Sequence, residues 1–331
     1  MPLLLIFVKR ASNGPEIEKV AVEKATRRTI IETVSTSGKI YPVTEIRVSP
    51  DFSGQVTELK VAEGDTVKKG QVLAVINNRS SIEASINGIV LSLKVKKGES
   101  VTGNSFSIGT EIMTIADMSQ LEIRADVGEN DIVKVTVGDS ADVMVDAYNN
   151  RKFKGVVKSI ANSTKSAGNS FNTSGDITNY EVRILLDTTS YSDLAGKYFP
   201  FRPGMNTSVE VRTRKAENVL SVPIAAVNAR IRDTDKSLDE KRKEDETKKE
   251  DGINTPEATG LLEEVVFVLQ KDNTVKKVLV KTGIQDIYNI EIREGISEGD
   301  QVVVGPYSAL SKTLRHGMKV KVVARDKLFE N

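Results

Sequence analysis

Residues 53–76 read S-G-Q-V-T-E-L-K-V-A-E-G-D-T-V-K-K-G-Q-V-L-A-V-I, and a second version of this phrase follows at residues 87–103 as N-G-I-V-L-S-L-K-V-K-K-G-E-S-V-T-G. The second version runs on to E-I-M-T-I-A-D at residue 117. An offset of 34 residues aligns the pairs Gly54/Gly88, Val56/Val90, Leu59/Leu93, Val61/Val95, Gly64/Gly98 and Val67/Val101, and places Asp65 on Glu99. Agreement in register over this length indicates an internal repeat.

Each copy of the repeat predicts a small curved sheet. Its valines and leucines lie on short runs, which is typical of strands. Gly64-Asp65 and Gly98-Glu99 supply the positive-φ turns between these strands, and Gly70 and Gly103 begin the next reversals. One copy of about 24 residues cannot bury its own apolar face. Two copies packed face to face can form a flattened barrel.

The duplicated phrase resembles the lipoyl/biotinyl half-motif, and this resemblance implies one of two uses. Carrier domains bear biotin or lipoate on a lysine in the turn between the halves. Membrane fusion (periplasmic adaptor) proteins use the same barrel without a cofactor and usually separate the halves by a long α-helical hairpin. Residues 77–86, N-N-R-S-S-I-E-A-S-I, contain no lysine that could form the amide, so a carrier is excluded and no cofactor is expected. These ten residues are also too few for the helical hairpin.

The length and composition of the chain limit its domain number and the classes of function open to it. A length of 331 residues predicts two or more domains. The net charge of +1 gives no global field that would recruit nucleic acid. The chain has no cysteine, which removes disulfides, thiol nucleophiles and thiolate metal sites, and no tryptophan.

The N-terminus carries a short apolar run from Leu3 to Val8. A membrane-spanning helix needs about 20 residues, so this run cannot span a bilayer. One interpretation is a short hydrophobic start without a role. The other is that residues 1–15 are the remnant of a truncated membrane anchor and the linker that follows it.

Two further β regions flank the repeat. In residues 16–41, imperfect alternation and a break at Gly38 predict two strands with too little apolar surface to form a domain, so they must pair with a distant segment. Residues 119–215 contain five period-two runs that predict a closed barrel or sandwich. A short helix is expected at 128–135, with acidic residues in its first turn, and a mobile loop at 162–178.

The second region also resembles a known domain. Asp146-Ala147, the pattern Phe153-x-Gly155-x-Val157 and the run F-R-P-G-M at 201–205 occur in the order seen in the β-barrel domain of periplasmic adaptor proteins. Pro203-Gly204 predicts a tight turn, after which Met205 starts the last barrel strand.

Residues 219–331 resemble the membrane-proximal domain of the same family. The phrases V-P-I-A-A-V, V-K-T-G and E-G-I-S-E-G-D-Q-V-V carry this resemblance, and turns are expected at Gly283, Gly295 and Gly299. In that family the N-terminal segment completes this domain. A mixed-charge stretch, 230–264, interrupts it and is interpreted either as a solvated insertion or as a docking segment for a partner. The phrase V-V-x-G-P-Y-S-A-L-S-K-T-L is similar to the macrolide-exporter (MacA-like) branch of the HlyD/RND-adaptor family.

The predicted fold is therefore all-β and multidomain, an elongated array with the long α-hairpin absent. The expected parts are the anchor remnant 1–15, the N-terminal strands 16–47 of the membrane-proximal domain, a lipoyl-like domain 48–118 with halves 53–76 and 87–117, a β-barrel domain 119–215, and the membrane-proximal domain 216–331.

No catalytic, cofactor-binding or metal-ligating residues are expected, and the chain is predicted not to be an enzyme. His316 is the single histidine, and one histidine can form neither a catalytic triad nor a histidine-based metal site. It is interpreted as a surface turn residue. No phosphate-binding G-x-x-x-x-G-K-[ST] motif occurs.

The resemblance implies an adaptor in the periplasm of a Gram-negative bacterium, associated with the inner membrane. Such an adaptor forms a ring of identical subunits and links an ABC (MacB-like) or RND transporter to an outer-membrane channel. The turns Ala62–Thr66 and Lys96–Ser100 are expected nearest the lumen of that ring. Without the hairpin the outer-membrane partner is in doubt, so a hairpinless adaptor that only modulates an inner-membrane transporter stays open. The rivals are a biotin/lipoyl carrier-like protein and a sugar- or metal-binding β-protein.

Overall fold

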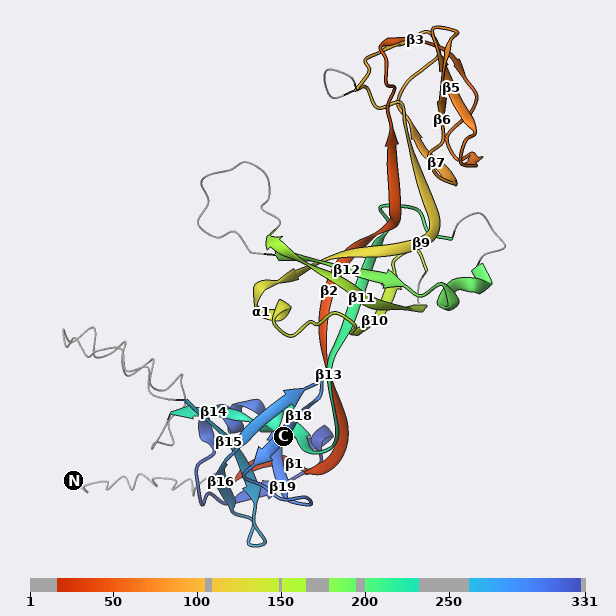
Figure 1. Ribbon diagram of the computed structural model, residues 1–331. Helices are drawn as coiled ribbons and strands as arrows, with labels where there is room; N and C mark the ends of the chain where they lie inside the picture. The colour runs from red at the N-terminus through yellow and green to blue at the C-terminus, as the bar shows by residue number, and fades with distance from the viewer. Residues whose placement is uncertain are drawn as a thin grey trace, which may run out of the picture. The chain divides into compact units, whose positions relative to one another are not determined.

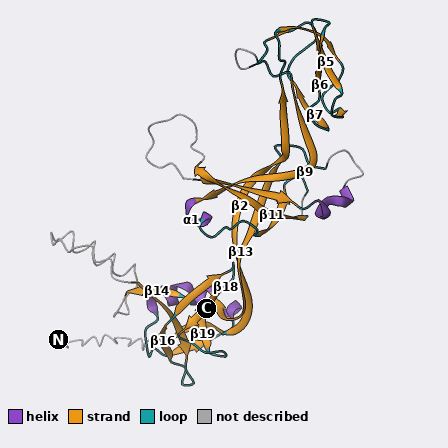
Figure 2. Cartoon of the chain, viewed as in Figure 1, coloured by secondary structure: helices purple, strands orange, loops and turns teal. Residues whose placement is uncertain are grey.

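The computed structural model describes residues 17–104, 109–148, 151–164, 179–194, 200–231 and 262–328 (Figure 1). Of these described residues, 59% lie in strands and 9% in helices, which confirms the all-β prediction. Figure 2 shows the few short helices among the strands. The predictions for residues 1–15, for most of the loop 162–178 and for most of the charged insertion 230–264 lie outside the described residues. Within the described ranges, no helix is long and apolar enough to cross a membrane.

The chain folds into two compact units. The terminal unit contains residues 1–32 and 214–331, and the central unit contains residues 33–213. The chain passes between them within β2 (Thr26–Val48) and β13 (Asn206–Pro223). The predicted segment 16–47 is therefore divided, because β2 continues into the central unit to pair with β9 (Met113–Gly128) from Gly38 onward. The other predicted domain boundaries stay predictions.

The predicted strand break at Gly38 is wrong. Gly38 lies inside β2 opposite Ala125, and the chain breaks instead at Ala25, between β1 (Glu18–Lys24) and β2. A Cβ atom at position 38 would lie 2.6 Å from the carbonyl oxygen of Arg124. This glycine therefore allows a close approach of two strands.

The strands of the repeat belong to two sheets. Four of them form a sheet of the order β6-β5-β3-β8, while β4 pairs with β7, and β7 pairs with β9 at the end of the ten-stranded sheet that also contains the barrel strands. The strands are β3 (Gly54–Leu59), β4 (Thr66–Val67), β5 (Val72–Ile76), β6 (Ser80–Glu83), β7 (Gly88–Leu93) and β8 (Ser100–Val101). Equivalent residues of the two copies have matching burial: Val56 and Val90 are both fully buried, and Val67 and Val101 are nearly so. Both copies contribute to one core, as predicted.

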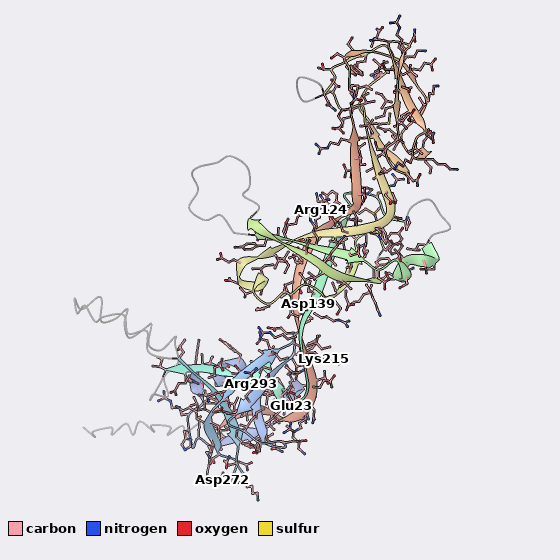
Figure 3. The ribbon with its side chains drawn as sticks, viewed as in Figure 1. Glu23, Arg124, Asp139, Lys215, Asp272 and Arg293 are labelled. Carbon is pink, nitrogen blue, oxygen red and sulfur yellow. The ribbon has the colours of Figure 1, made fainter. Side chains whose placement is uncertain are left out.

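The barrel of the central unit has the strand order β13-β10-β11-β12-β9, and β2 pairs with β9 and β13. Its other elements are α1 (Glu129–Ile132), β10 (Ser140–Val145), β11 (Lys152–Thr164), β12 (Asn179–Leu186) and η1 (Thr188–Leu194). The short helix α1 begins with the predicted acidic residues. Arg124 of β9, labelled in Figure 3, lies over the ring of Tyr41 on β2 at 4.6 Å from its centroid and pairs with Glu122.

The R-P-G-M turn has the predicted form. Gly204 has a φ of 88°, and its N–H donates to the carbonyl of Ile40 at 2.8 Å. The N–H of Ile40 donates in return to the carbonyl of Met205 at 3.0 Å, and β13 begins at Asn206. The preceding Phe201 is fully buried, and its ring packs edge to face against Phe153 at 5.1 Å, Tyr191 at 5.2 Å and Tyr148 at 5.5 Å.

In the terminal unit the N-terminal segment pairs with distant strands, as predicted. β1 is antiparallel to β19 (Gln301–Gly305) and parallel to β20 (Val320–Val322). The remaining elements are η2 (Ile224–Ala226), β14 (Asn228–Ile231), β15 (Leu262–Leu269), β16 (Val275–Leu279), β17 (Lys281–Gln285), β18 (Asn289–Glu294), η3 (Ala309–Thr313) and η4 (Arg325–Lys327).

The glycine turns of the terminal unit are confirmed at two of three positions. Gly295 and Gly299 have positive φ angles. The turn predicted at Gly283 is wrong, because this residue lies inside β17. The Glu291 carboxylate fills the space that a side chain would need there, and it accepts a hydrogen bond from the N–H of Ile284 at 3.0 Å.

We predict that replacing Gly64 or Gly98 by alanine destabilises the central unit by about 1–2 kcal/mol in each case. Their φ angles are 88° and 90°, and no atom beyond the adjacent residues lies within 4 Å of the added Cβ, so the cost is that of the backbone conformation alone. Asparagine tolerates positive φ better, so Gly64→Asn is expected to cost less than Gly64→Ala. Chemical denaturation of the full chain measures both, with Lys69→Ala as an exposed control. Equal costs for alanine and asparagine would contradict this explanation.

Candidate functional site

The two repeated turns are closed by their own acidic residues. The Asp65 carboxylate accepts a hydrogen bond from the N–H of Ala62 at 2.8 Å, and the Glu99 carboxylate accepts one from the N–H of Lys96 at 2.8 Å. The N–H of Asp65 also donates to the carbonyl of Ala62, and the N–H of Glu99 donates to the carbonyl of Lys96. The acids of the repeat therefore fix the shape of the turns.

Each turn is bound to the other copy of the repeat. The N–H of Gly64 donates to the carbonyl of Val90 at 2.8 Å, and the N–H of Val90 donates to the carbonyl of Asp65 at 3.0 Å. In the second copy the N–H of Gly98 donates to the carbonyl of Val56 at 2.7 Å, and the N–H of Val56 donates to that of Glu99 at 2.9 Å. These two turns are the ones predicted to face a lumen. In the structure the first turn is hydrogen-bonded to β7 and the second to β3.

The link between the copies is a tight turn followed by a strand. Asn77 and Asn78 have positive φ angles of 49° and 58°, and β6 then pairs with β5. The Asn77 side-chain oxygen accepts a hydrogen bond from the N–H of Gln55 at 2.8 Å, which ties the link to β3. No helix is present in residues 77–86, all of which the structure describes. The predicted absence of a helical hairpin agrees with this geometry.

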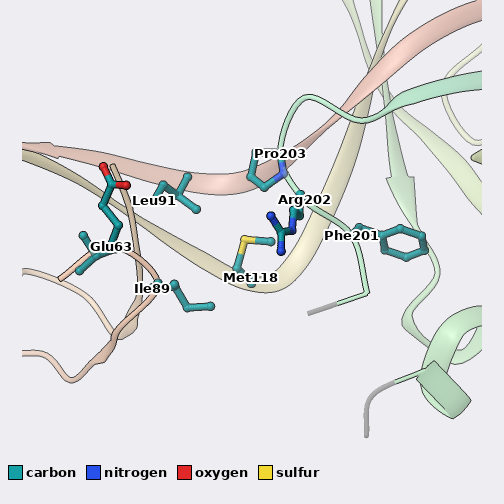
Figure 4. Close-up of a pocket in the computed structure, with 9 residues that line it drawn as sticks. Glu63, Ile89, Leu91, Met118, Phe201, Arg202 and Pro203 are labelled. Atoms are coloured by element: carbon teal, nitrogen blue, oxygen red, sulfur yellow. The ribbon is translucent and has the colours of Figure 1, made fainter. Parts of the chain in front are cut away.

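A pocket of about 490 Å³ lies where the repeat meets the barrel (Figure 4). The repeat and β9 supply Glu63, Gly64, Ile89, Val90, Leu91 and Met118, and the loop before β13 supplies Phe201, Arg202 and Pro203. Sequence reasoning missed this pocket, because the F-R-P-G-M run was interpreted only as a turn. The signal that could have found it is the arginine, which the turn itself does not require.

Three family models match successive parts of the chain. The barrel-sandwich hybrid domain of YknX matches residues 44–116, and the YknX-like beta-barrel domain matches residues 121–211. The C-terminal permuted SH3 domain of RND MFPs matches residues 260–315.

A curated relative extends these matches. "Putative efflux system component YhbJ" of Bacillus subtilis is 32% identical over 171 residues, which cover 50% of this chain and 72% of YhbJ. The chain belongs to the membrane fusion protein family. Another member, the pyoverdine export membrane fusion protein PvdR of Pseudomonas putida, is 24% identical over 69% of this chain, and the match spans about half of PvdR, 52%.

The fold agrees with that of a solved structure. The crystal structure of MacA from Actinobacillus actinomycetemcomitans aligns with a TM-score of 0.63 at 19% identity, covering 86% of this chain and 99% of the MacA chain. The MacA-like prediction is thus supported at the level of the fold. The relatives and this fold together indicate a membrane fusion (adaptor) protein of efflux systems.

One ion pair of this membrane fusion protein lines a separate hollow of about 320 Å³, which shares Leu91 and Pro203 with the pocket. Lys94 donates to Glu111 at 2.9 Å, and the Thr114 hydroxyl donates to the same carboxylate at 2.7 Å. The hydrogen bond from Lys94, followed by the one from Thr114, holds the pKa of Glu111 below its usual value.

His316 lies where the sequence predicts. It is exposed in a turn after η3, and its Nδ1 atom accepts a hydrogen bond from the N–H of Lys277 at 3.4 Å. Across the described part of the chain, no group of three or more histidine, aspartate or glutamate side chains is placed to hold a metal ion.

We predict that Glu111→Gln lowers stability at neutral pH but not at acid pH. Because the folded pKa is lowered, the ionised carboxylate contributes stability above its unfolded pKa of about 4.3, and this contribution is lost as the pH falls through the folded pKa. Urea denaturation between pH 7 and pH 3 should therefore show the two proteins converging as the pH falls. Glu58→Gln is the control, since Glu58 forms only a long, exposed ion pair with Lys60 at 3.8 Å. A difference that does not change with pH would contradict the assignment.

Proposed function

We propose that this membrane fusion protein is a non-catalytic adaptor subunit of a bacterial efflux or secretion system. Its periplasmic position, its association with the inner membrane and its assembly into a ring of identical subunits are parts of the proposal. The partner is an inner-membrane transporter of the ABC (MacB-like) or RND type. Family membership and the efflux-related names of the relatives support this role.

The observation that carries the proposal is the interlocked repeat with a lysine-free link. A carrier needs a lysine at the exposed turn between the copies, but Asn77 and Asn78 occupy the turn, and Asn77 is bound to β3. The acids of the repeated turns are used to close the backbone. Such a domain is suited to a structural role, and its link offers no lysine for the attachment of biotin or lipoate. Intact mass spectrometry without a biotin or lipoate adduct would agree with this.

A narrower role is the second candidate function. The helical hairpin of related adaptors is the part that reaches an outer-membrane channel. Here the four-residue strand β6 follows the inter-copy turn and pairs with β5 along its length. This observation favours an adaptor that modulates its inner-membrane transporter without bridging to an outer-membrane channel.

Co-expression with the transporter encoded beside the gene tests both functions. Affinity purification followed by native mass spectrometry should yield a complex with several copies of this chain per transporter. Copurification of an outer-membrane channel would favour the bridging role, and a complex without a channel would favour the modulating role. A monomer that binds no transporter would contradict the proposal.

We predict that Lys97→Glu lowers transport while leaving the fold intact. The turn 96–100 is expected to face the lumen, and the Lys97 side chain is exposed and makes no hydrogen bond or ion pair with the described residues. Retention of a dye that the wild-type system exports measures the effect. Lys271→Glu, an exposed change in the terminal unit, is the control. Unchanged transport with Lys97→Glu would remove this turn from the lumen.

A further inference from the structure

We propose that the pocket between the repeat and the barrel binds an amphipathic organic anion, a small molecule with an apolar ring body and one carboxylate or sulfonate. Binding of such a molecule by the chain itself goes beyond the adaptor role, because it requires no transporter and no second copy. The pocket lies wholly within the central unit.

The size and the walls of the pocket suit a ring body. Its volume of about 490 Å³ lies within the range of small-molecule sites, roughly 300–1,000 Å³. Val90 and Phe201 are fully buried, and Ile89 and Met118 are less than a tenth exposed. These side chains belong to two packed cores, so the apolar walls are preformed.

The apolar surface continues beyond this pocket. A second hollow of about 500 Å³ shares Ile89 and Met118 with the first and extends along β4 to Lys68. The two hollows together form a trough with an apolar middle. One cationic residue lies in each, Arg202 in the first and Lys68 in the second.

The acidic side chains of the trough form hydrogen bonds within the described part of the protein, and its basic side chains form none there. The Glu63 carboxylate accepts a hydrogen bond from the N–H of Leu93 at 2.7 Å, and the Asp117 carboxylate accepts one from the N–H of Ser119 at 2.8 Å. In contrast, the Arg202 and Lys68 side chains form no hydrogen bond or ion pair with any described residue. The acids are thus engaged with the backbone, while the cations are available to an anion from solution.

Arg202 is the better placed of the two cations. It follows Phe201, whose ring is held by three aromatic side chains, and it precedes the Pro203-Gly204 turn. The loop that carries it is therefore anchored on both sides. In Figure 4 the Arg202 side chain extends from this loop toward Met118. A guanidinium next to an apolar wall can bind a carboxylate or sulfonate in a bidentate manner while the wall takes the ring body.

The test uses two probes that share one ring system. 8-Anilinonaphthalene-1-sulfonate carries a sulfonate, and N-phenyl-1-naphthylamine is its neutral counterpart. Fluorescence titration of the full-length protein should show saturable binding of both. Arg202→Gln should weaken binding of the sulfonate probe about tenfold, because a hydrogen bond to a charged group is lost. The same substitution should leave the affinity for the neutral probe unchanged. Arg79→Gln, at an exposed arginine outside the pocket, should change neither.

A second variant tests the position of the ring body. Leu91→Trp fills the pocket and should weaken both probes together, with circular dichroism confirming that the fold is retained. Absence of binding, or sulfonate binding that Arg202→Gln does not weaken, overturns the proposal. These measurements need no transporter, so a negative result would not contradict the proposed adaptor role. Conversely, failure to capture a transporter would not contradict ligand binding in the pocket.

Discussion

The exchange of hydrogen bonds between Gly64-Asp65 and Val90, and between Gly98-Glu99 and Val56, is the constraint on which the repeat domain depends. The turn of each copy is hydrogen-bonded to a strand of the other copy, so neither copy can satisfy its turn by itself. The buried valines of the two copies then meet in a single core. A copy in isolation would leave its turn amides without protein partners and its apolar face exposed to water, and the exposed apolar face is unfavourable. The two halves are therefore expected to fold as one cooperative unit.

The long strand β9 connects the repeat to the barrel. Its first half pairs with β7 of the repeat, and its second half pairs with β12 of the barrel. Residues of β9 accordingly enter both cores, with Met113 and Ile115 in the repeat and Ile123 and Ala125 in the barrel. Met118 lies between these two halves of the strand, and the pocket forms around it. The pocket is thus a consequence of one continuous strand that serves two cores.

Much of this fold could be predicted because its signals are local or repeated. The offset of the two copies predicts the shared core, and Pro203-Gly204 predicts the turn before β13. The errors at Gly38 and Gly283 have a common physical origin. A glycine breaks a pattern in the sequence, but its role is decided by what lies opposite, which is the Arg124 carbonyl in one case and the Glu291 carboxylate in the other. The pocket was missed for the same reason, since residues 63 and 202 come to line one pocket only through the tertiary fold.

The same exchange leaves the length of the link between the copies free to vary. The copies are held together by Gly64, Gly98 and their partners, and none of these residues belongs to segment 77–86. The link only has to leave β5 and return to β7. Closing a longer link costs little, since loop entropy rises slowly with length. A long helical hairpin and the short Asn77-Asn78 turn with β6 are therefore compatible with the same barrel, so the reach of an adaptor can change while its core is kept.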